Sequence, residues 1–193
     1  MSNTTFIPTP DLRQMAWEMR FPIEKVTRRQ SLAEHTYFVA MNADLLAQHI
    51  GWGGDYAALL RESLRHDLDE LVSGDIPTPV KKVLKAFPET WDAFQFWVTS
   101  QLKTKLPWWT PEDATEEISW MISIADTLEA VCYLHEEAAS GNKLVGGVLE
   151  YLKGVLLAKV EKVPASLASR KPKVIEFIVE TIMRAENQNI TVC

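Results

Sequence analysis

The sequence predicts an all-α protein, and three observations support this prediction. Apolar residues recur at helical spacing along most of the 193 residues. Alternating, strand-like patterns are sparse. Hydrophobic residues make up 47% of the chain and charged residues 24%, which is typical of a globular protein with a full-sized core. We therefore expect one helical domain over residues 1–193.

Start and stop signals divide the first half of the chain into helices. Ser31 followed by Glu34 is a capping-box signature, although Glu34 could instead pair with a nearby arginine. Asp55 is a suitable N-cap, and Pro79 suits a first helical turn. By residue range, the helices expected here are 11–20, 32–50, 55–73 and 78–86.

The second half of the chain continues the helical pattern. Residues 110–113 are a start signal, and Gly141 is a stop signal. The aromatic segment 107–109 lies between helices, so we expect it to fill a core edge or a partner surface rather than to stack on a base. The helices expected here are 89–105, 115–140, 143–160 and 171–187.

Charge and cysteine content narrow the class of protein. The net charge of −6 argues against a protein that coats nucleic acid, which needs a basic surface. The only cysteines, Cys132 and Cys193, are unsuited to a structural disulfide and fit a reducing compartment. The N-terminus has no signal-peptide pattern, and no apolar run is long enough to cross a bilayer. We expect a cytoplasmic protein, in the host cytoplasm if it is encoded by a phage.

An adjacent histidine and aspartate, His66 and Asp67, interrupt an apolar helical stretch. Burying imidazole beside carboxylate costs free energy unless another group compensates both. A divalent cation does so, because it accepts a neutral imidazole nitrogen and a carboxylate oxygen together. Neighbours on a helix diverge by about 100°, so the two can reach one ion only at a helix end or a loosened turn. The Gly- and Pro-containing segment 74–79 supplies such an end.

Two further candidate ligands lie elsewhere in the chain. His35 stands near the start of one helix, and Asp126 is a lone acid among the apolar residues of another. With His66 and Asp67 they form a set of nitrogen and oxygen donors that suits Co²⁺, Mn²⁺, Zn²⁺ or Fe²⁺ better than Mg²⁺. The other histidines lack such company and are expected at the solvent edge: His49 and His135.

The order of these residues resembles that of HD-domain metal-dependent phosphohydrolases. The resemblance is greatest to the bacterial 5′-deoxynucleotidases and the related phage deoxynucleoside triphosphohydrolases, and it spans about residues 12–145. It implies a single HD domain. Residues 146–193 carry no chemical motif, and we expect them to pack on this core or on a partner. A bare His-Asp pair is weak evidence, whereas a following glutamate and the sequence GDIPTPVK are specific. The segments that carry the resemblance are 20–22, 33–36, 66–70, 74–81 and 125–128.

The resemblance also implies roles for residues outside the ligand set. Glu70, one helical turn beyond His66, matches the residue that orients or deprotonates the attacking water. Asp75 matches the group that protonates the leaving oxygen. Arg20 and Lys81 would hold phosphate oxygens. Further implied substrate contacts are Phe21, Thr78 and Lys82. The family pattern has tryptophan at the position of Phe21, so base or sugar selectivity is where this chain departs from it.

The implied substrate is a deoxynucleotide, in nucleotide-pool control. A monophosphate and a triphosphate such as dATP both fit the resemblance, and cations at Lys82 or Lys85 slightly favour a triphosphate. The resemblance also implies a homodimer or higher homo-oligomer. The net charge and the lack of a long apolar run predict no nucleic-acid or membrane partner. Two alternatives remain at this point. One is a second reaction hosted by HD helices, guanosine tetraphosphate hydrolysis or di-iron oxygenation. The other is a non-catalytic nucleotide-binding module, which would not need both Glu70 and Asp75.

Overall fold

The computed structural model describes residues 10–107, 109 and 114–187 of the chain. These residues form helices and connecting turns, with one isolated bridge between Met19 and Ser31 and no strand among them. The all-α prediction is confirmed. The chain divides into two compact units. The small unit comprises residues 1–23, 30–33 and 67–111, and the large unit comprises 24–29, 34–66 and 112–193. One domain over residues 1–193 stays a prediction.

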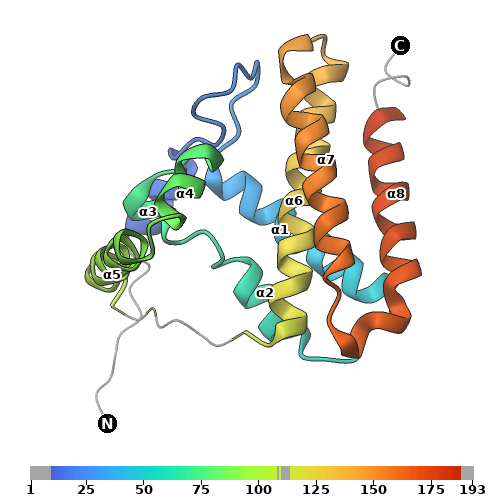
Figure 1. The fold of residues 1–193 in the computed structure, drawn as a ribbon, viewed down its shortest axis with the longest axis horizontal. Coiled ribbons are helices and arrows are strands. Elements are labelled where there is room, and N and C mark those ends of the chain that lie inside the picture. Colours follow the sequence, from blue (N-terminus) through green and yellow to red (C-terminus); the bar gives the residue numbers. More distant parts are fainter. Residues whose placement is uncertain (1–9, 108, 110–113, 188–193) are drawn as a thin grey trace. The chain divides into compact units, whose positions relative to one another are not determined.

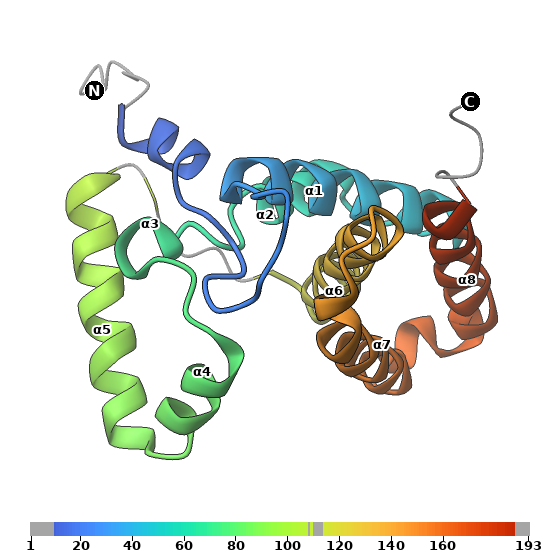
Figure 2. The same cartoon turned by 90° about the horizontal axis from the view of Figure 1, so that it is seen from above.

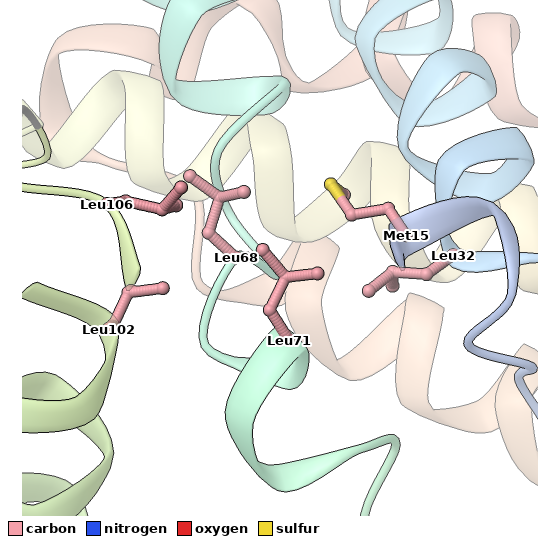
Figure 3. Packing of buried hydrophobic residues seen from close by; sticks show 6 residues of the cluster. All are labelled: Met15, Leu32, Leu68, Leu71, Leu102 and Leu106. Carbon is pink, nitrogen blue, oxygen red and sulfur yellow. The ribbon is translucent and has the colours of Figure 1, made fainter. Parts of the chain in front are cut away.

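The small unit is built around its longest helix, α5 (Pro88–Lys105). In Figure 2, α5 runs past the two short helices α3 (Glu70–Ser73) and α4 (Thr78–Lys85). Its core is a cluster of buried apolar side chains from the start of the chain, the short helix α3 and the end of α5 (Figure 3). Each fully buried leucine in it stabilises the fold by about 2 kcal/mol. The elements are η1 (Pro10–Ala16), α3 (Glu70–Ser73), α4 (Thr78–Lys85) and α5 (Pro88–Lys105). The cluster consists of Met15, Leu32, Leu68, Leu71, Leu102 and Leu106.

Polar and aromatic contacts complete this core. Lys105 Nζ donates to the Leu71 carbonyl at 3.3 Å and to Gln14 Oε1 at 3.2 Å, which ties the end of α5 to α3 and η1. Trp109 packs against the cluster, as expected for the aromatic segment. Trp108 and the start signal at 110–113 lie outside the described residues.

The large unit is organised around α6, whose residues are mostly buried. Helices α7 and α8 run alongside it in Figures 1 and 2. A helix that is apolar on most of its surface requires partners on several sides, and these neighbours supply them. The α-helices are α1 (Leu32–His49, whose first two residues belong to the small unit), α2 (Tyr56–Ser63), α6 (Glu116–Ala139), α7 (Gly146–Glu161) and α8 (Lys171–Asn187). Two 3₁₀ helices, η2 (Lys143–Val145) and η3 (Ala165–Arg170), complete it.

One predicted cap and one predicted stop are observed, together with a second cap that was not predicted. Asp55 Oδ1 accepts the backbone N–H of Ala58 at 3.0 Å and begins α2. Thr115 caps α6 by accepting the N–H of Ile118. Gly141, at φ +94°, follows the end of α6 in the left-handed conformation that favours glycine. Among the described helices, none combines the length and the apolarity that crossing a bilayer requires.

The sequence predicted one continuous helix over 55–73. This prediction is wrong, because the structure has two helices separated by turns. Helix α2 ends at Ser63, α3 begins at Glu70, and residues 64–69 form turns. His66 Nδ1 lies 2.7 Å from the Ser63 carbonyl oxygen, which in a continuous α-helix would accept the N–H of residue 67. The imidazole thus satisfies a carbonyl at the end of the helix. Helix 143–160 likewise begins as the separate turn η2, and η3 was not predicted.

Candidate metal centre

Three of the four predicted ligands meet within the large unit. One ligand atom from each of His35, His66 and Asp126 lies within 4.8 Å of the other two. His35 is fully buried in the first turns of α1, and its Nε2 is 3.4 Å from Asp126 Oδ1 in the middle of α6. His66 comes from the turns that follow α2. The break after Ser63 is therefore what places this imidazole beside residues of two other helices.

The hydrogen bonds of the two imidazoles indicate which nitrogen faces a cation. The Ser63 carbonyl can only accept, so His66 Nδ1 carries the proton and Nε2 carries the lone pair. His35 Nδ1 lies 2.5 Å from Glu129 Oε2, and donation to this carboxylate likewise leaves Nε2 as the ligand atom. Metal-binding histidines are usually held in this way through their second nitrogen. The donor set therefore fits a divalent ion.

Glu129 is a functional residue that the sequence reasoning missed. It is only 4% exposed and lies three residues after Asp126, hence on the same face of α6. A carboxylate that accepts from His35 Nδ1 fixes the ring orientation and makes Nε2 a stronger donor. The signal was available, because a second acid on an apolar helix at a spacing of three residues repeats the pattern that identified Asp126.

Glu129 belongs to a longer row of polar groups, which we call the polar stripe of α6. Glu137 accepts the backbone N–H groups of Thr27 at 2.6 Å and of Arg28 at 2.8 Å. The Tyr133 hydroxyl donates to the Arg28 carbonyl. The stripe thereby fastens the segment 24–29, which precedes α1. Its members follow one another at steps of three or four residues: Asp126, Glu129, Tyr133 and Glu137.

The environment of Glu137 stabilises its charged form. Burial alone would raise the pKa of Glu137. Hydrogen bonds from the Thr27 backbone, the Asn142 side chain and the Arg28 backbone outweigh burial and lower this pKa below its ordinary value. Glu34, for which the sequence left two roles open, pairs with the side chain of Arg28, whose Nη1 is 2.5 Å from Glu34 Oε1.

A lysine from α7 approaches the other oxygen of the candidate ligand on α6. Lys159 Nζ is 3.7 Å from Asp126 Oδ2 and donates to the Ser123 carbonyl at 2.9 Å and to Thr127 Oγ1 at 2.6 Å. Asp126 therefore directs one oxygen towards His35 and the other towards an ammonium group. The sequence analysis did not select Lys159. Asp67 is not part of the three-residue cluster, and its role as a fourth ligand stays a prediction.

The small unit contains the predicted base and one predicted phosphate contact as an ion pair. Glu70 is 5% exposed, and Lys81 Nζ donates to its Oε1 at 3.0 Å. Burial, together with the nearby carboxylates of Asp67 and Asp75, raises the pKa of Glu70 to about 8, although Lys81 opposes the shift. Burial would lower the pKa of Lys81, but the charge of Glu70 and the hydrogen bond to it, followed by the charges of Asp67 and Asp75, outweigh burial and raise this pKa. The Lys81 ammonium group thus lies among three acids, Glu70, Asp67 and Asp75.

The predicted proton donor and the predicted substrate contacts near residue 20 also meet in the small unit. Phe21 donates its backbone N–H to Asp75 Oδ2 at 3.0 Å. The Arg20 guanidinium lies over the Phe21 ring, 5.1 Å from its centroid, and Arg20 Nη1 donates to Gln30 Oε1 at 3.3 Å. Asp75 therefore contacts the turn that carries the predicted substrate contacts.

Other predicted substrate contacts lie on α4. Thr78 and Lys82 are exposed, so their substrate roles stay predictions. Lys85 Nζ stacks over the Trp91 ring at 4.9 Å, which gives it a packing contact. Among the tryptophans of the helices, Trp120 is buried, whereas Trp97 is 48% exposed.

The prediction for His135 is wrong, because it is buried rather than at the solvent edge. It is 8% exposed, with Nε2 3.6 Å from Glu186 Oε1. Burial and the nearby charge of Lys153 lower the pKa of His135. His49 is half-buried, with Nε2 3.3 Å from Glu176 Oε2.

Comparison with known proteins identifies the family to which this arrangement belongs. The model of the family described as 5′-deoxynucleotidase YfbR-like matches residues 9–161. The chain belongs to this family. The 5′-deoxynucleotidases YfbR of Shigella dysenteriae serotype 1 and Escherichia coli O1:K1 are each 28% identical to it over 177 residues, which cover 85% of this chain and 83% of theirs. The resemblance inferred from the sequence is confirmed, and the protein is a hydrolase of the YfbR-like family.

Solved structures show that the YfbR-like chain has the HD-domain fold. The HD phosphohydrolase DatZ of cyanophage S-2L, solved with dA and one catalytic Zn²⁺ ion, aligns with a TM-score of 0.70 at 18% identity, covering 93% of this chain and 98% of DatZ. An HD-domain phosphohydrolase of Listeria innocua aligns with a TM-score of 0.57 at 18% identity, covering 92% and 85%.

Proposed function

We propose that this protein is a metal-dependent phosphohydrolase of deoxynucleotides. The observation that carries the proposal is the cluster of His35, His66 and Asp126, in which His35 is buried and both imidazoles present Nε2. Asp67, which directly follows His66 in the chain, is proposed as the fourth ligand. Zn²⁺, Co²⁺, Mn²⁺ and Fe²⁺ suit this set of nitrogen and oxygen donors, and the Zn²⁺ in DatZ supports a metal of this class.

The side chains of the small unit suit the same reaction. A divalent ion supplies Lewis acidity, which favours ionisation of water and holds a phosphate oxygen. Glu70 takes a proton from the attacking water, for which a carboxyl pKa of about 8 makes it a stronger base than an ordinary glutamate. Lys81, which donates to Glu70, and Arg20 bind phosphate oxygens. Phe21 packs against the sugar or the base.

Phosphate release tests the reaction directly. Purified protein is incubated with dAMP and with dATP, each with Mn²⁺ or Co²⁺ and each with EDTA. We expect orthophosphate, or inorganic triphosphate from dATP, only with the metal. Glu70→Ala should keep its metal and lose most turnover. Metal-independent release, or full turnover by Glu70→Ala, would contradict the proposal.

Metal content tests the ligand assignment separately from turnover. Asp126→Asn should bind less metal than wild type when both are dialysed and analysed by mass spectrometry, because the amide is a weaker donor than the carboxylate. Asp44→Asn, on α1 in the same unit, is the matched control and should retain full metal content. Equal metal in both variants would remove Asp126 from the ligand set.

The proposal extends to the phosphorylation level of the substrate. Exposed Lys82 on α4 favours acceptance of triphosphates, and a screen of all deoxy- and ribonucleotides at each phosphorylation level tests this.

We propose a homodimer or higher homo-oligomer, supported by an exposed apolar row on α1. Light scattering should show a mass above that of the monomer, and Met41→Glu should lower it. The row consists of Tyr37, Phe38, Met41 and Leu45.

A further inference from the structure

The turn at Arg20 and Phe21 adopts an unfavourable backbone conformation. Phe21 has a φ of +57°, and in the described part of the chain it is the one residue other than glycine with positive φ. The missing Cβ lets glycine adopt this region freely, whereas a bulky side chain populates it roughly tenfold less readily. Such a conformation persists where the surrounding structure enforces it, and it is frequent at functional sites.

Asp75 supplies the enforcing contact. Residues 18–20 pair with residues 30–32 through backbone hydrogen bonds, including Arg20 N–H to the Gln30 carbonyl at 3.0 Å. At Phe21 the chain turns away, and its N–H donates instead to Asp75 Oδ2, which is 54 residues distant in the sequence. Asp75 is itself placed by Gly74, whose φ of +65° turns the chain after α3.

The turn connects this hydrogen bond to the substrate contacts. The Arg20 guanidinium is held at Gln30 and lies over the Phe21 ring. The two side chains therefore pack together, and the orientation of both depends on the backbone conformation at Phe21. Arg20 is the proposed phosphate contact and Phe21 the proposed contact to sugar or base. Loss of the bond from Phe21 to Asp75 would release both together.

We propose that Asp75 is a positioning residue, which holds the turn at Arg20 and Phe21 in its substrate-binding conformation by accepting the Phe21 N–H. This inference rests on the proposed function. It differs from the proton-donor role that the sequence predicted for Asp75. A proton donor must carry a proton to the leaving oxygen, whereas an acceptor of an N–H needs only an oxygen lone pair. Asparagine retains such an oxygen and cannot act as the acid.

Two variants separate these roles. Kinetics of dAMP hydrolysis with Mn²⁺ are measured for Asp75→Asn and Asp75→Ala, with Asp92→Ala on the exposed face of α5 as control. We expect Asp75→Asn to stay within about threefold of wild type, with an unchanged pH profile. Asp75→Ala should raise KM by about tenfold, the effect of losing one hydrogen bond to a charged group. Equal loss of kcat in both variants, by about a hundredfold or more and with a changed alkaline limb, would show a proton donor and overturn the proposal.

A second readout does not depend on turnover. Amide hydrogen exchange of Phe21 is followed by NMR in the metal-free protein. Asp75→Ala should accelerate it by about tenfold, whereas Asp75→Asn and Asp92→Ala should change it little. If Asp75→Ala lowers the midpoint of urea unfolding, the double variant Asp75→Ala/Phe21→Gly should have a higher midpoint than Asp75→Ala alone, because glycine removes the backbone strain. Unchanged exchange in Asp75→Ala overturns the positioning role. Absence of phosphate release from any deoxynucleotide by the wild type would instead overturn the proposed function, while the exchange data still decide the role of Asp75.

Discussion

Replacing Glu70 by glutamine should stabilise the metal-free protein at alkaline pH. The pKa of Glu70 is raised from 4.5 to about 8, chiefly by burial. Between these values the folded chain keeps a proton on Glu70 that the unfolded chain has lost. The folded state then binds one proton more, so the free energy of unfolding falls by about 1.4 kcal/mol for each pH unit. The stability is therefore fully present below pH 4.5 and is lost as the pH rises through about 8.

The size of the effect follows from the same two pKa values. The interval from 4.5 to about 8 is about 3.5 pH units, which corresponds to roughly 5 kcal/mol. Glutamine has no charge to lose and keeps an oxygen that accepts from Lys81 Nζ. The difference in unfolding free energy between Glu70→Gln and wild type should grow from near zero at pH 4.5 to several kcal/mol above pH 8. Turnover should fall by about 10² to 10⁴, as for the loss of a general base.

Urea unfolding of EDTA-treated protein, followed by circular dichroism from pH 4.5 to 9, measures this difference. Removing the metal keeps ion binding out of the measured stability. Glu89→Gln, an exposed carboxylate of α5 in the same unit, is the matched control and should show no growing difference. A difference for Glu70→Gln that stays flat with pH, or a variant less stable than wild type at pH 8, would refute the reasoning.

Three further predictions concern other parts of the molecule. Glu129→Gln should weaken Zn²⁺ binding by about 10- to 100-fold in competition with a chelator, because a neutral amide supports His35 Nδ1 less strongly than a carboxylate; unchanged affinity would contradict this. Glu137→Gln should lower the free energy of unfolding at pH 7, and the difference should vanish as the pH falls through the lowered pKa of Glu137; a constant difference would argue against this origin. Leu102→Ala should cost about 2–5 kcal/mol in urea unfolding, against less than about 0.5 for exposed Val83→Ala, and equal costs would place Leu102 outside the core.

Local signals in the sequence predicted most of the helices. Asp55 began α2 as expected, because an N-cap needs only an N–H three residues away. The break between Ser63 and Glu70 could not be predicted in the same way. It depends on an imidazole that bonds a helix-end carbonyl and on Leu68 and Leu71 entering the core of the small unit. The apolar spacing over 55–73 is equally compatible with a continuous helix.

In the candidate site, too, some contacts could be predicted from the sequence and others could not. The convergence of His35, His66 and Asp126 followed from the order of the motifs and from their chemistry. The contact between Phe21 and Asp75 could not be predicted, because it joins two loops 54 residues apart without any periodic pattern. The family resemblance assigned a chemical role to each of these two residues and was silent about their bond to each other.

The polar stripe of α6 shows that helical spacing can predict that a buried acid has a partner but not which residue that partner is. Helical spacing places Glu129 and Glu137 on one face, and burying either acid without a partner would cost several kcal/mol. Such a stripe therefore implies donors opposite it. It cannot identify them, because His35 and the Thr27 N–H lie 94 and 110 residues away in the sequence. The same stripe fastens His35 and the segment 24–29, so the candidate metal centre depends on the contact between His35 and α6. Substitutions that loosen the anchor at Glu137 should therefore weaken metal binding at a distance from the ligands.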